Sequence, residues 1–423
     1  MGRGTFRSQN KVGETMSFQT DSSSGTTFNP AVTFLSGSDR VSWDLGEGGG
    51  YIADSSLSYT YPDTGTTKTV TLRTNKLSNL KTFTCPNLYH DLDMSGWDNL
   101  SSINISNFPT NLSLTGITHT YSPQVFTSYY IHKNNIIGNL DLSMFPNFGG
   151  VLSTWQNANL TSITHTASTQ LFTSYRVENC DLTGNHDMSM LTNLSGLIRL
   201  NNNSITSVSH TGNSNIITQY FVNNNNLTGN LDLSMFPNFG GSFRAYTNPL
   251  LTSITHTAST QVFISYQAYT SDITGTHDLT MFPNLGGSFN MSANANLTGV
   301  THTASTQIFS EYNLRGCDLT GNHDVSMFPN LGTSFLVYTN PNLTSITHTP
   351  STQTFSLYLV SSNNLTGNHD MSGLSGLGGQ FWIYNNPLLT SITHTASTQT
   401  FSQYYAYSCN LTGNHDMSMF PGL

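Results

Sequence analysis

The sequence predicts a mainly β protein: a small N-terminal β-sandwich followed by a parallel β-solenoid with little helix. Three observations carry this prediction: a 46-residue unit that recurs along most of the chain, strand-like spacing in each half of the unit, and the lack of helix-forming runs. One copy, residues 342–387, reads NLTSITHTPSTQTFSLYLVSSNNLTGNHDMSGLSGLGGQFWIYNNP. A fixed period of this size is the sequence signature of a solenoid or a propeller.

Two markers show how regular the repeat is. The histidine of a Thr-His-Thr element recurs in steps of 46 residues, with a single step of 45, at His119, His165, His210, His256, His302, His348 and His394. An aspartate in the second half of the unit keeps the same period, at Asp141, Asp187, Asp232, Asp278, Asp324, Asp370 and Asp416. The unit therefore behaves as one structural module that is stacked on its neighbours.

Each unit divides into two halves of ~23 residues, which we expect to be two rungs of the solenoid. The first half places apolar side chains at fixed offsets, as in Phe355, Tyr358, Val360 and Leu365, with Asn, Cys or Ser before the last of them. The second half repeats this frame and carries an asparagine at Asn157, Asn202, Asn248, Asn294, Asn340 and Asn386. An Asn side chain offers both donors and an acceptor, so we expect these residues to satisfy buried turn backbone.

The frame resembles the leucine-rich repeat L-x-x-L-x-L-x-x-N/C-x-L, and its 23-residue rung is most similar to the bacterial BspA-like subtype. The resemblance covers residues 80–423. It implies a solenoid with one parallel strand per rung on its main sheet. Aromatic residues replace the first two leucines, and the Thr/Ser/Asn-rich outer segments predict turns and irregular crossovers where many leucine-rich repeats have helices.

The N-terminal part of the chain differs from the repeats. We expect residues 1–20 to form an extended arm, residues 21–76 a small β-sandwich, and residues 77–423 the solenoid. The segment 43–48 (WDLGEG), the Tyr-Thr-Tyr-Pro of residues 59–62 and the strand-like run 65–72 (GTTKTVTL) resemble a PKD-type immunoglobulin-like domain. Residues 80–114 echo the repeats imperfectly, which is typical of a capping repeat, so the sandwich is expected to pack on this end.

Composition and charge exclude several functions. Only 8% of the residues are charged and the formal net charge is −9. Nine of the thirteen Lys and Arg precede residue 134 and none follows Arg315, so the repeats lack the basic stripe that a nucleic-acid partner requires. The first eighteen residues hold no apolar run of signal-peptide type, and no stretch is apolar enough to span a membrane.

The histidines, aspartates and cysteines of the repeats predict neither a metal site nor a cofactor site. Histidines of one column are two rungs apart, ~10 Å at the strand spacing of a sheet, whereas Zn²⁺ needs ligands ~2 Å away. The second histidine column is interrupted by Leu140 and Leu231. One aspartate per ~10 Å does not supply the converging oxygens of a Ca²⁺ site, and Asp here is expected to cap a turn. Cys180, Cys317 and Cys409 are whole repeats apart, too far for disulfides, and are predicted to be packed thiols. No nucleophile–base pair stands out, so we expect no enzyme.

What varies between repeats predicts a binding face. The residue after the fixed Tyr of the first half changes from repeat to repeat, while the inward positions stay constant. The matching row of the second half reads Trp155, Leu200, Tyr246, Ser292, Tyr338 and Tyr384. A constant scaffold with a varied sheet face is how solenoids present ligand sites. The candidate ligand-binding residues are Trp155, Tyr246, Tyr338, Trp382, Tyr384, Tyr405 and Tyr407, and their alternative role is to stiffen an exposed sheet as cross-strand pairs.

These features lead to three hypotheses of function. The first is a non-enzymatic phage virion surface protein, such as a head fibre, a decoration protein or a tail-associated adhesin, which displays the solenoid for host or surface attachment. In it the arm and sandwich contact other virion proteins, and the chain is expected to form a homo-oligomer. The second is a bacterial cell-surface adhesin of BspA-like type. The third is a carbohydrate-binding module that uses the aromatic face. The resemblance to solenoid proteins of Bacteroidota-type bacteria and their phages supports the first two.

Overall fold

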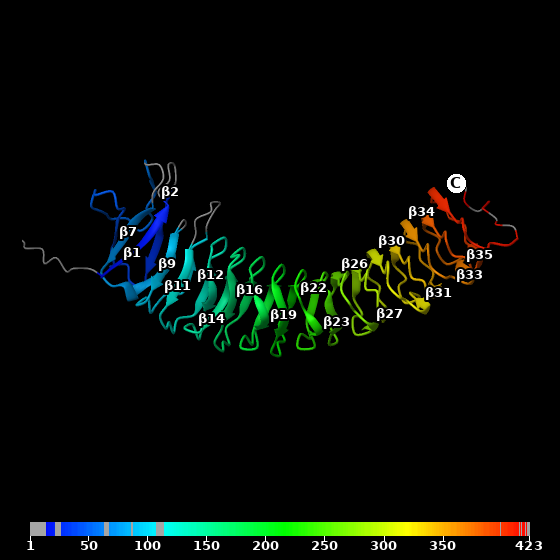
Figure 1. Cartoon of the computed structure of the whole chain (residues 1–423), viewed down its shortest axis with the longest axis horizontal. Helices are drawn as coiled ribbons and strands as arrows, with labels where there is room; N and C mark the ends of the chain where they lie inside the picture. The colour runs from blue at the N-terminus through cyan, green and yellow to red at the C-terminus, as the bar shows by residue number, and fades with distance from the viewer. Residues whose placement is uncertain are drawn as a thin grey trace, which may run out of the picture. The chain divides into compact units, whose positions relative to one another are not determined.

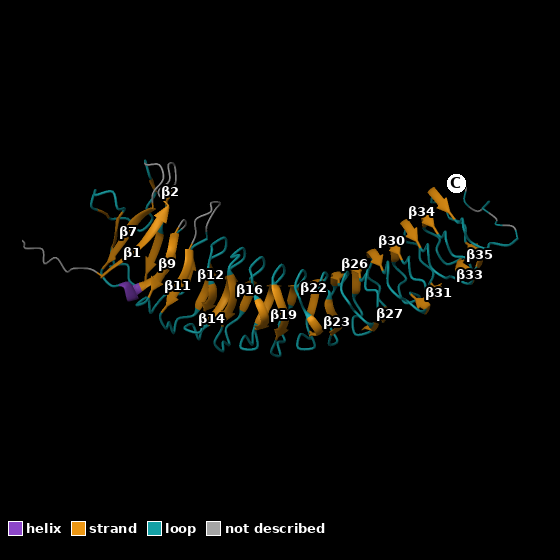
Figure 2. Ribbon diagram, viewed as in Figure 1, coloured by secondary structure: helices purple, strands orange, loops and turns teal. Residues whose placement is uncertain are grey.

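The computed structural model describes residues 14–21, 27–62, 67–85, 88–106, 114–397, 399–413, 415, 417–418 and 420. The chain divides into two compact units, residues 1–194 and 195–423, and both are built from strands (Figure 1, Figure 2). The only helical element of the described residues is a 3₁₀ turn, η1 (Leu77–Asn79). In the same part of the chain, no helix has the length and apolar character needed to cross a membrane.

The first unit opens with a mixed sheet whose central strands are antiparallel. Its strand order is β11 (Leu114–His119), β9 (Leu88–Met94), β1 (Glu14–Asp21), β7 (Thr67–Thr74), β4 (Val41–Asp44) and β5 (Tyr51–Ile52), in which β9 and β11 pair in parallel. A separate antiparallel pair joins β2 (Thr27–Phe28) to β6 (Tyr59–Thr60). The strand-like run around residues 65–72 thus coincides with most of β7.

The core of this region forms around Trp43. Its ring meets Phe18 and Phe28 edge-on, with centroids 6.4 and 5.9 Å apart, and its Nε1 donates a hydrogen bond to the carbonyl oxygen of Asp54 at 2.7 Å. Met16 and Phe18 alternate inward along β1. Residues 14–20, which we expected in an extended arm, therefore belong to a paired strand, because their alternating apolar side chains complete this core. Residues 1–13 lie outside the described residues.

The N-terminal region pairs with the first solenoid rung, as we expected for a capped entry. Strand β3 (Ala31–Phe34) pairs antiparallel with β8 (Leu80–Thr84). Parallel strands then follow, one per rung: β10 (Ser102–Asn104), β12 (Phe126–Tyr130), β14 (Phe148–Ser153) and β16 (Phe172–Arg176). On the other side of the rungs lie β13 (Gly138–Asp141), which pairs with β15 (Leu160–Thr164), and β17 (Thr183–Asp187).

The second unit continues the same architecture. Its long parallel sheet consists of β18 (Leu194–Arg199), β20 (Ile217–Phe221), β22 (Phe239–Arg244), β24 (Phe263–Gln267), β26 (Leu285–Asn290), β28 (Phe309–Asn313), β30 (Leu331–Leu336), β32 (Phe355–Leu359), β34 (Leu377–Trp382) and β36 (Phe401–Tyr405). Short strands lie on the opposite side of the rungs: β19 (Ser204–Ser209) and the parallel pairs β21 (Thr228–Asp232) with β23 (Leu250–Thr255), β25 (Gly275–Leu279) with β27 (Leu297–His302), β29 (Gly321–Asp324) with β31 (Leu343–Thr347), and β33 (Gly367–Met371) with β35 (Leu389–His394).

The long sheet is held together by an inward column of aromatic rings. In register along the second unit are Tyr220, Phe243, Tyr266, Phe289, Tyr312, Phe335, Tyr358, Phe381 and Tyr404. Tyr and Phe alternate because each 46-residue unit supplies two rungs. Neighbouring rings make close contact, as between Phe289 and Tyr312 with centroids 4.9 Å apart. The predicted parallel β-solenoid is confirmed, with about 14 turns of ~23 residues.

The predicted asparagine ladder satisfies the turn after each strand. Asn294 donates from Nδ2 to the carbonyl oxygens of Ala268 and Met291 at 2.9 and 2.7 Å, and its Oδ1 accepts from the backbone N–H of Ile273 at 3.2 Å. Our assignment of Asn202 to this ladder was wrong by one position. Asn203 makes the equivalent bond, to the carbonyl oxygen of Leu200 at 2.9 Å, because the single 45-residue step shifts the frame.

Candidate binding face

The long sheet of the second unit turns two rows of side chains away from the core. The first row, in register, is Arg199, Phe221, Arg244, Gln267, Asn290, Asn313, Leu336, Leu359, Trp382 and Tyr405. The second row lies two residues further along each rung: Asn201, Asn223, Tyr246, Tyr269, Ser292, Arg315, Tyr338, Ser361, Tyr384 and Tyr407. We call these two rows the display face. Leu200, which we placed in the second row, is fully buried, and Asn201 stands there instead.

Four predicted site residues form one cluster, which we call the end cluster: Trp382, Tyr384, Tyr405 and Tyr407. Trp382 stacks on Tyr405 with centroids 5.7 Å apart and an interplanar angle of 25°, and Tyr384 stacks on Tyr407 at 4.8 Å and 6°. Trp382 is oriented by a hydrogen bond from Nε1 to Oε1 of Gln403 at 3.2 Å. Tyr405 and Tyr407, on the rung of β36, are 40% and 57% exposed, so both side chains can contact a ligand.

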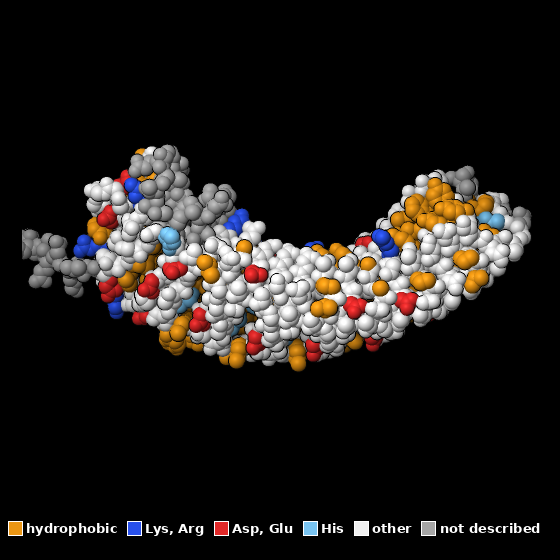
Figure 3. All heavy atoms as spheres, viewed as in Figure 1, with side chains coloured by type: hydrophobic (Ala, Val, Ile, Leu, Met, Phe, Trp, Pro, Cys, Tyr) orange, Lys and Arg blue, Asp and Glu red, His pale blue; other side chains and the backbone are white. Residues whose placement is uncertain are grey.

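The first row of the display face is apolar beside the end cluster, although Leu359 is itself buried. Leu336 and Leu359 precede Trp382 in the first row of the display face, and hydrophobic side chains gather around β30 and β34 (Figure 3). Tyr338, also a candidate ligand-binding residue, is separated from the end cluster by Ser361 in the second row. Among the described residues, Tyr338 has its aromatic contact with Arg315, whose guanidinium carbon lies 5.5 Å from the ring centroid.

Tyr246 belongs to a second stacked pair on the display face. Its ring lies parallel to that of Tyr269, with centroids 4.4 Å apart and an interplanar angle of 5°. Partial burial, and then the neighbouring Tyr246, raise the pKa of Tyr269 above its ordinary value, so the hydroxyl stays protonated at neutral pH. The pair is a rigid, flat and neutral platform.

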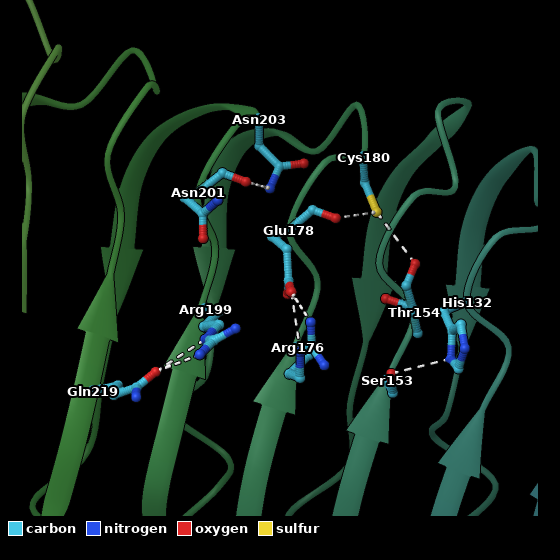
Figure 4. Close-up of polar contacts among 10 residues, drawn as sticks. All are labelled: His132, Ser153, Thr154, Arg176, Glu178, Cys180, Arg199, Asn201, Asn203 and Gln219. Atoms are coloured by element: carbon cyan, nitrogen blue, oxygen red, sulfur yellow. Dashed lines mark hydrogen bonds and ion pairs between the residues drawn. The ribbon is translucent and has the colours of Figure 1, made fainter.

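Arginines line the start of the display face in the second unit. The guanidinium carbons of Arg199 and Arg244 lie 5.2 and 4.5 Å from the centroid of Phe221. Arg199 also donates from Nε to Oε1 of Gln219 at 3.1 Å (Figure 4). Cation–π contact with Phe221 constrains both arginines against the sheet, and the hydrogen bond to Gln219 constrains Arg199 further.

Trp155 lies in the first unit, in a different setting. It stacks on His132, with centroids 4.7 Å apart and an interplanar angle of 8°, and Lys133 and Arg176 approach its ring to 5.1 and 5.3 Å. Burial and then the two cations lower the pKa of His132 to about 4. Arg176 is paired with Glu178 (Figure 4), where its Nε donates to Oε1 at 3.0 Å. Trp155 is therefore covered by cations, unlike the end cluster.

Sequence reasoning missed Tyr269 as the partner of Tyr246 and Arg315 as the partner of Tyr338. In the sequence, the outward residues of the first and second halves of the 46-residue repeats form two separate series. In the structure they are alternate rungs of one sheet, so Tyr269 of a first half stacks directly on Tyr246 of a second half. Interleaving the two rows of the sequence would have placed these residues side by side.

The histidine columns serve the core. Tyr312 Oη lies 2.8 Å from Nε2 of His302 and 2.9 Å from Nε2 of His323. The same arrangement recurs around Tyr175, Tyr266, Tyr358 and Tyr404. Nδ1 of His302 has no hydrogen-bond partner, and an unmet acceptor is less costly than an unmet donor. We therefore assign the Nε2–H tautomer to His302, whose proton is donated to Tyr312, which in turn donates to His323.

The remaining ligand-type residues are also occupied by structural contacts. Asp278 Oδ1 accepts the backbone N–H of Thr280 at 2.9 Å, and the same Asx turn recurs along the aspartate column, which confirms the predicted turn cap. Cys317 is a buried thiol that contacts the carbonyl oxygen of Met291 at 3.4 Å. Within the described residues, no group of three His, Cys, Asp or Glu side chains is placed to hold a metal ion.

The display face can therefore offer flat aromatic surfaces, amide groups and guanidinium groups to a ligand, all held on rigid strands. Such a surface suits recognition through stacking and hydrogen bonding. Comparison of the chain with protein-family models, with curated proteins and with solved structures gives no match.

Proposed function

We propose that this chain is a non-enzymatic attachment protein whose display face binds a ligand on another surface. The observation that supports this proposal is a contrast between the two sides of the same rungs. The display face changes from rung to rung, from Arg244 to Asn290 to Trp382. The short-strand side is nearly the same in every repeat: threonine occupies the same position of successive 46-residue repeats, at Thr252, Thr298, Thr344 and Thr390. The greater variety of the display face favours a role in recognition.

The proposal includes a molecular context. We propose that the rungs are leucine-rich repeats of BspA-like type and that strands β1–β7 form a PKD/Ig-like sandwich. We place the protein on a phage virion, as a head fibre, decoration protein or tail-associated adhesin, in which the N-terminal region contacts other virion proteins and the chain forms a homo-oligomer. The low content of charged residues and the Thr/Ser/Asn-rich outer surface support a surface location. A bacterial cell-surface adhesin is the alternative.

Location and assembly can be tested together. An antibody against the chain should detect it in purified phage particles, and light scattering of the purified protein should give a mass above that of one 46.2 kDa chain. Recovery in the outer-surface fraction of bacterial cells, without phage, would favour the alternative. Absence from both fractions would contradict the proposed location.

A carbohydrate ligand is the second part of the proposal, because the end cluster exposes two tyrosine side chains, Tyr405 and Tyr407, beside a stacked Trp382. Sugar rings pack their C–H faces on flat aromatic surfaces, which bury area without ordering many side chains. The test is binding to an array of glycans by the wild-type protein and by Trp382→Ala and Tyr384→Ala. Thr390→Ala, on the short-strand side, is the control. Binding that these two aromatic substitutions leave unchanged would rule out the end cluster as the sugar site.

A further inference from the structure

A hollow lies in the display face at a distance from the end cluster. Its volume is about 640 Å³, and Tyr269, Asn290, Ser292, Asn313, Arg315 and Tyr338 are among the residues that line it. It exists because the second row reads Tyr269, Ser292, Arg315, Tyr338, so that a small side chain stands between large ones. Tyr269 and Tyr338 are three rungs apart, ~14 Å at the strand spacing of a sheet. The volume is within the range of small-ligand sites.

The two ends of the hollow are rigid aromatic walls. Tyr269 is held by its stack on Tyr246, at 4.4 Å between centroids. Tyr338 is held by the guanidinium of Arg315, 5.5 Å from its centroid. Asn290 and Asn313, from the first row, line the hollow with amide groups. Their oxygens accept the backbone N–H groups of Ser292 and Arg315 at 3.0 and 3.1 Å, which fixes the orientation of both side chains.

Arg315 gives the hollow its charge. Its side chain is exposed, and in the described part of the second unit no carboxylate lies within ion-pair distance of it. On the same rung, the carboxylate of Glu311 accepts from Ser288 Oγ at 3.0 Å and from Asn313 Nδ2 at 3.1 Å. Arg176, in contrast, is neutralised by Glu178. The guanidinium of Arg315 therefore has donors to offer to an anion at the edge of an aromatic hollow.

We propose that this hollow binds an acidic saccharide, a sugar unit that carries a carboxylate. The sugar ring would lie between Tyr269 and Tyr338 above Ser292, its hydroxyl groups would meet the amides of Asn290 and Asn313, and its carboxylate would pair with Arg315. A planar guanidinium binds a carboxylate through two parallel hydrogen bonds. The inference rests on the proposed attachment function and adds a ligand class and a second site on the same face.

The test compares matched ligands and matched variants. The probes are an array of oligosaccharides that contain uronic or sialic acid, each beside its methyl ester, which removes the charge and keeps the ring. We expect the full chain to bind acidic members, to lose at least about tenfold in affinity for the esters, and to lose a similar factor on Arg315→Gln. Arg315→Lys, which keeps the charge without the planar fork, should fall between them. Ser292→Trp, which fills the hollow, should abolish binding.

Several outcomes would overturn the proposal. These are no binding to any acidic member, equal binding to acids and esters, unchanged binding by Arg315→Gln, or equal binding to a polyglutamate peptide. A control separates this inference from the proposed function: neutral glycans or host surfaces bound through Trp382 and Tyr384 would still be bound by Arg315→Gln. If that binding persists and no acidic oligosaccharide of the array is bound, the proposed attachment function is supported and the acidic-saccharide site is ruled out.

Discussion

Thr333 occupies the same left-handed backbone position that Gly287 occupies one unit earlier. Their φ angles are 61° and 65°. A Cβ on Gly287 would lie 2.0 Å from the carbonyl oxygen of Ile264, which explains why glycine stands at this position of most 46-residue repeats, at Gly150, Gly196, Gly241 and Gly379. A β-branched residue in this region of backbone space is strained.

We therefore expect Thr333→Gly to stabilise the protein. Removing left-handed strain gains ~1–3 kcal/mol, and the greater freedom of glycine in the unfolded chain offsets ~0.5–1 kcal/mol of it. The free energy of unfolding, measured by urea denaturation, should rise by about 1 kcal/mol. The reverse change, Gly287→Thr, should lower it. If Thr333→Gly is less stable than the wild type, the contacts of the threonine side chain stabilise the protein by more than the left-handed backbone strain destabilises it.

Buried histidines should make the protein sensitive to acid. Burial lowers the pKa of His323 to about 4 and that of His302 well below its ordinary value. In the unfolded chain both titrate near 6.5. As the pH falls from about 6.5 towards 4, these histidines become protonated in the unfolded state while they stay neutral in the folded state. Their contribution to the free energy of unfolding is therefore complete above pH 6.5 and is lost progressively in this window. His323 alone accounts for about 3 kcal/mol at most.

The measurement is the urea midpoint at pH 7.5, 6 and 5. The sequence offers a matched variant, because Leu140 and Leu231 occupy the position of His323 in two other units and both are buried. His323→Leu should stay close to wild-type stability at pH 7.5 and show a shallower loss on acidification. An equal loss in both proteins would mean that this histidine column does not control the acid transition.

Removing one rung of the asparagine ladder should be costly. Asn294→Ala removes a hydrogen-bond partner from three buried backbone groups, those of Ala268, Met291 and Ile273. The carbonyl oxygen of Met291 keeps only the weaker contact with Cys317 Sγ, and each unmet group costs ~1–3 kcal/mol. We expect a loss of several kcal/mol in urea denaturation. The control is Asn296→Ala: Asn296 is exposed and makes one side-chain bond, to Asp272, so its loss should stay under ~1 kcal/mol. Similar losses in the two variants would contradict the ladder's role.

The sequence predicts the solenoid well because its period, its inward aromatic positions and its turn asparagines are backbone requirements that every rung shares. It predicts the display face less well. Which outward side chains touch depends on the register between rungs, and one 45-residue step was enough to misplace Asn202 and Leu200. The hollow beside Arg315 could not be predicted, because it arises from Ser292, a small residue with no motif of its own. The His–Tyr–His contacts join residues ten and eleven positions apart, a spacing that no strand or helix periodicity selects.

Cys317 stands at a turn position where other repeats carry asparagine or serine, so substitutions there test which of these residues the position accepts. Its Sγ reaches the carbonyl oxygen of Met291 at 3.4 Å, whereas Asn363, one unit later, donates to Val337 and Val360 at 2.7 and 2.9 Å. Burial raises the pKa of Cys317 to about 11, so it acts here as a weak neutral donor. Cys317→Asn should keep or raise the urea midpoint, because an amide makes stronger bonds to the same carbonyl groups.

Cys317→Ala should lower that midpoint, by ~1 kcal/mol in the free energy of unfolding, because it opens a small void and removes the Sγ contact to the carbonyl oxygen of Met291, which keeps its hydrogen bond from Asn294. The native thiol should also react slowly with iodoacetamide at pH 8, since only the thiolate is the nucleophile. If Asn and Ala destabilise the protein equally, the position selects for side-chain volume. If only Cys317→Asn keeps the stability of the wild type, the position requires a hydrogen bond to the preceding rung. Asparagine, cysteine and serine, which alternate at this position between repeats, would then make the same hydrogen bond with different strengths.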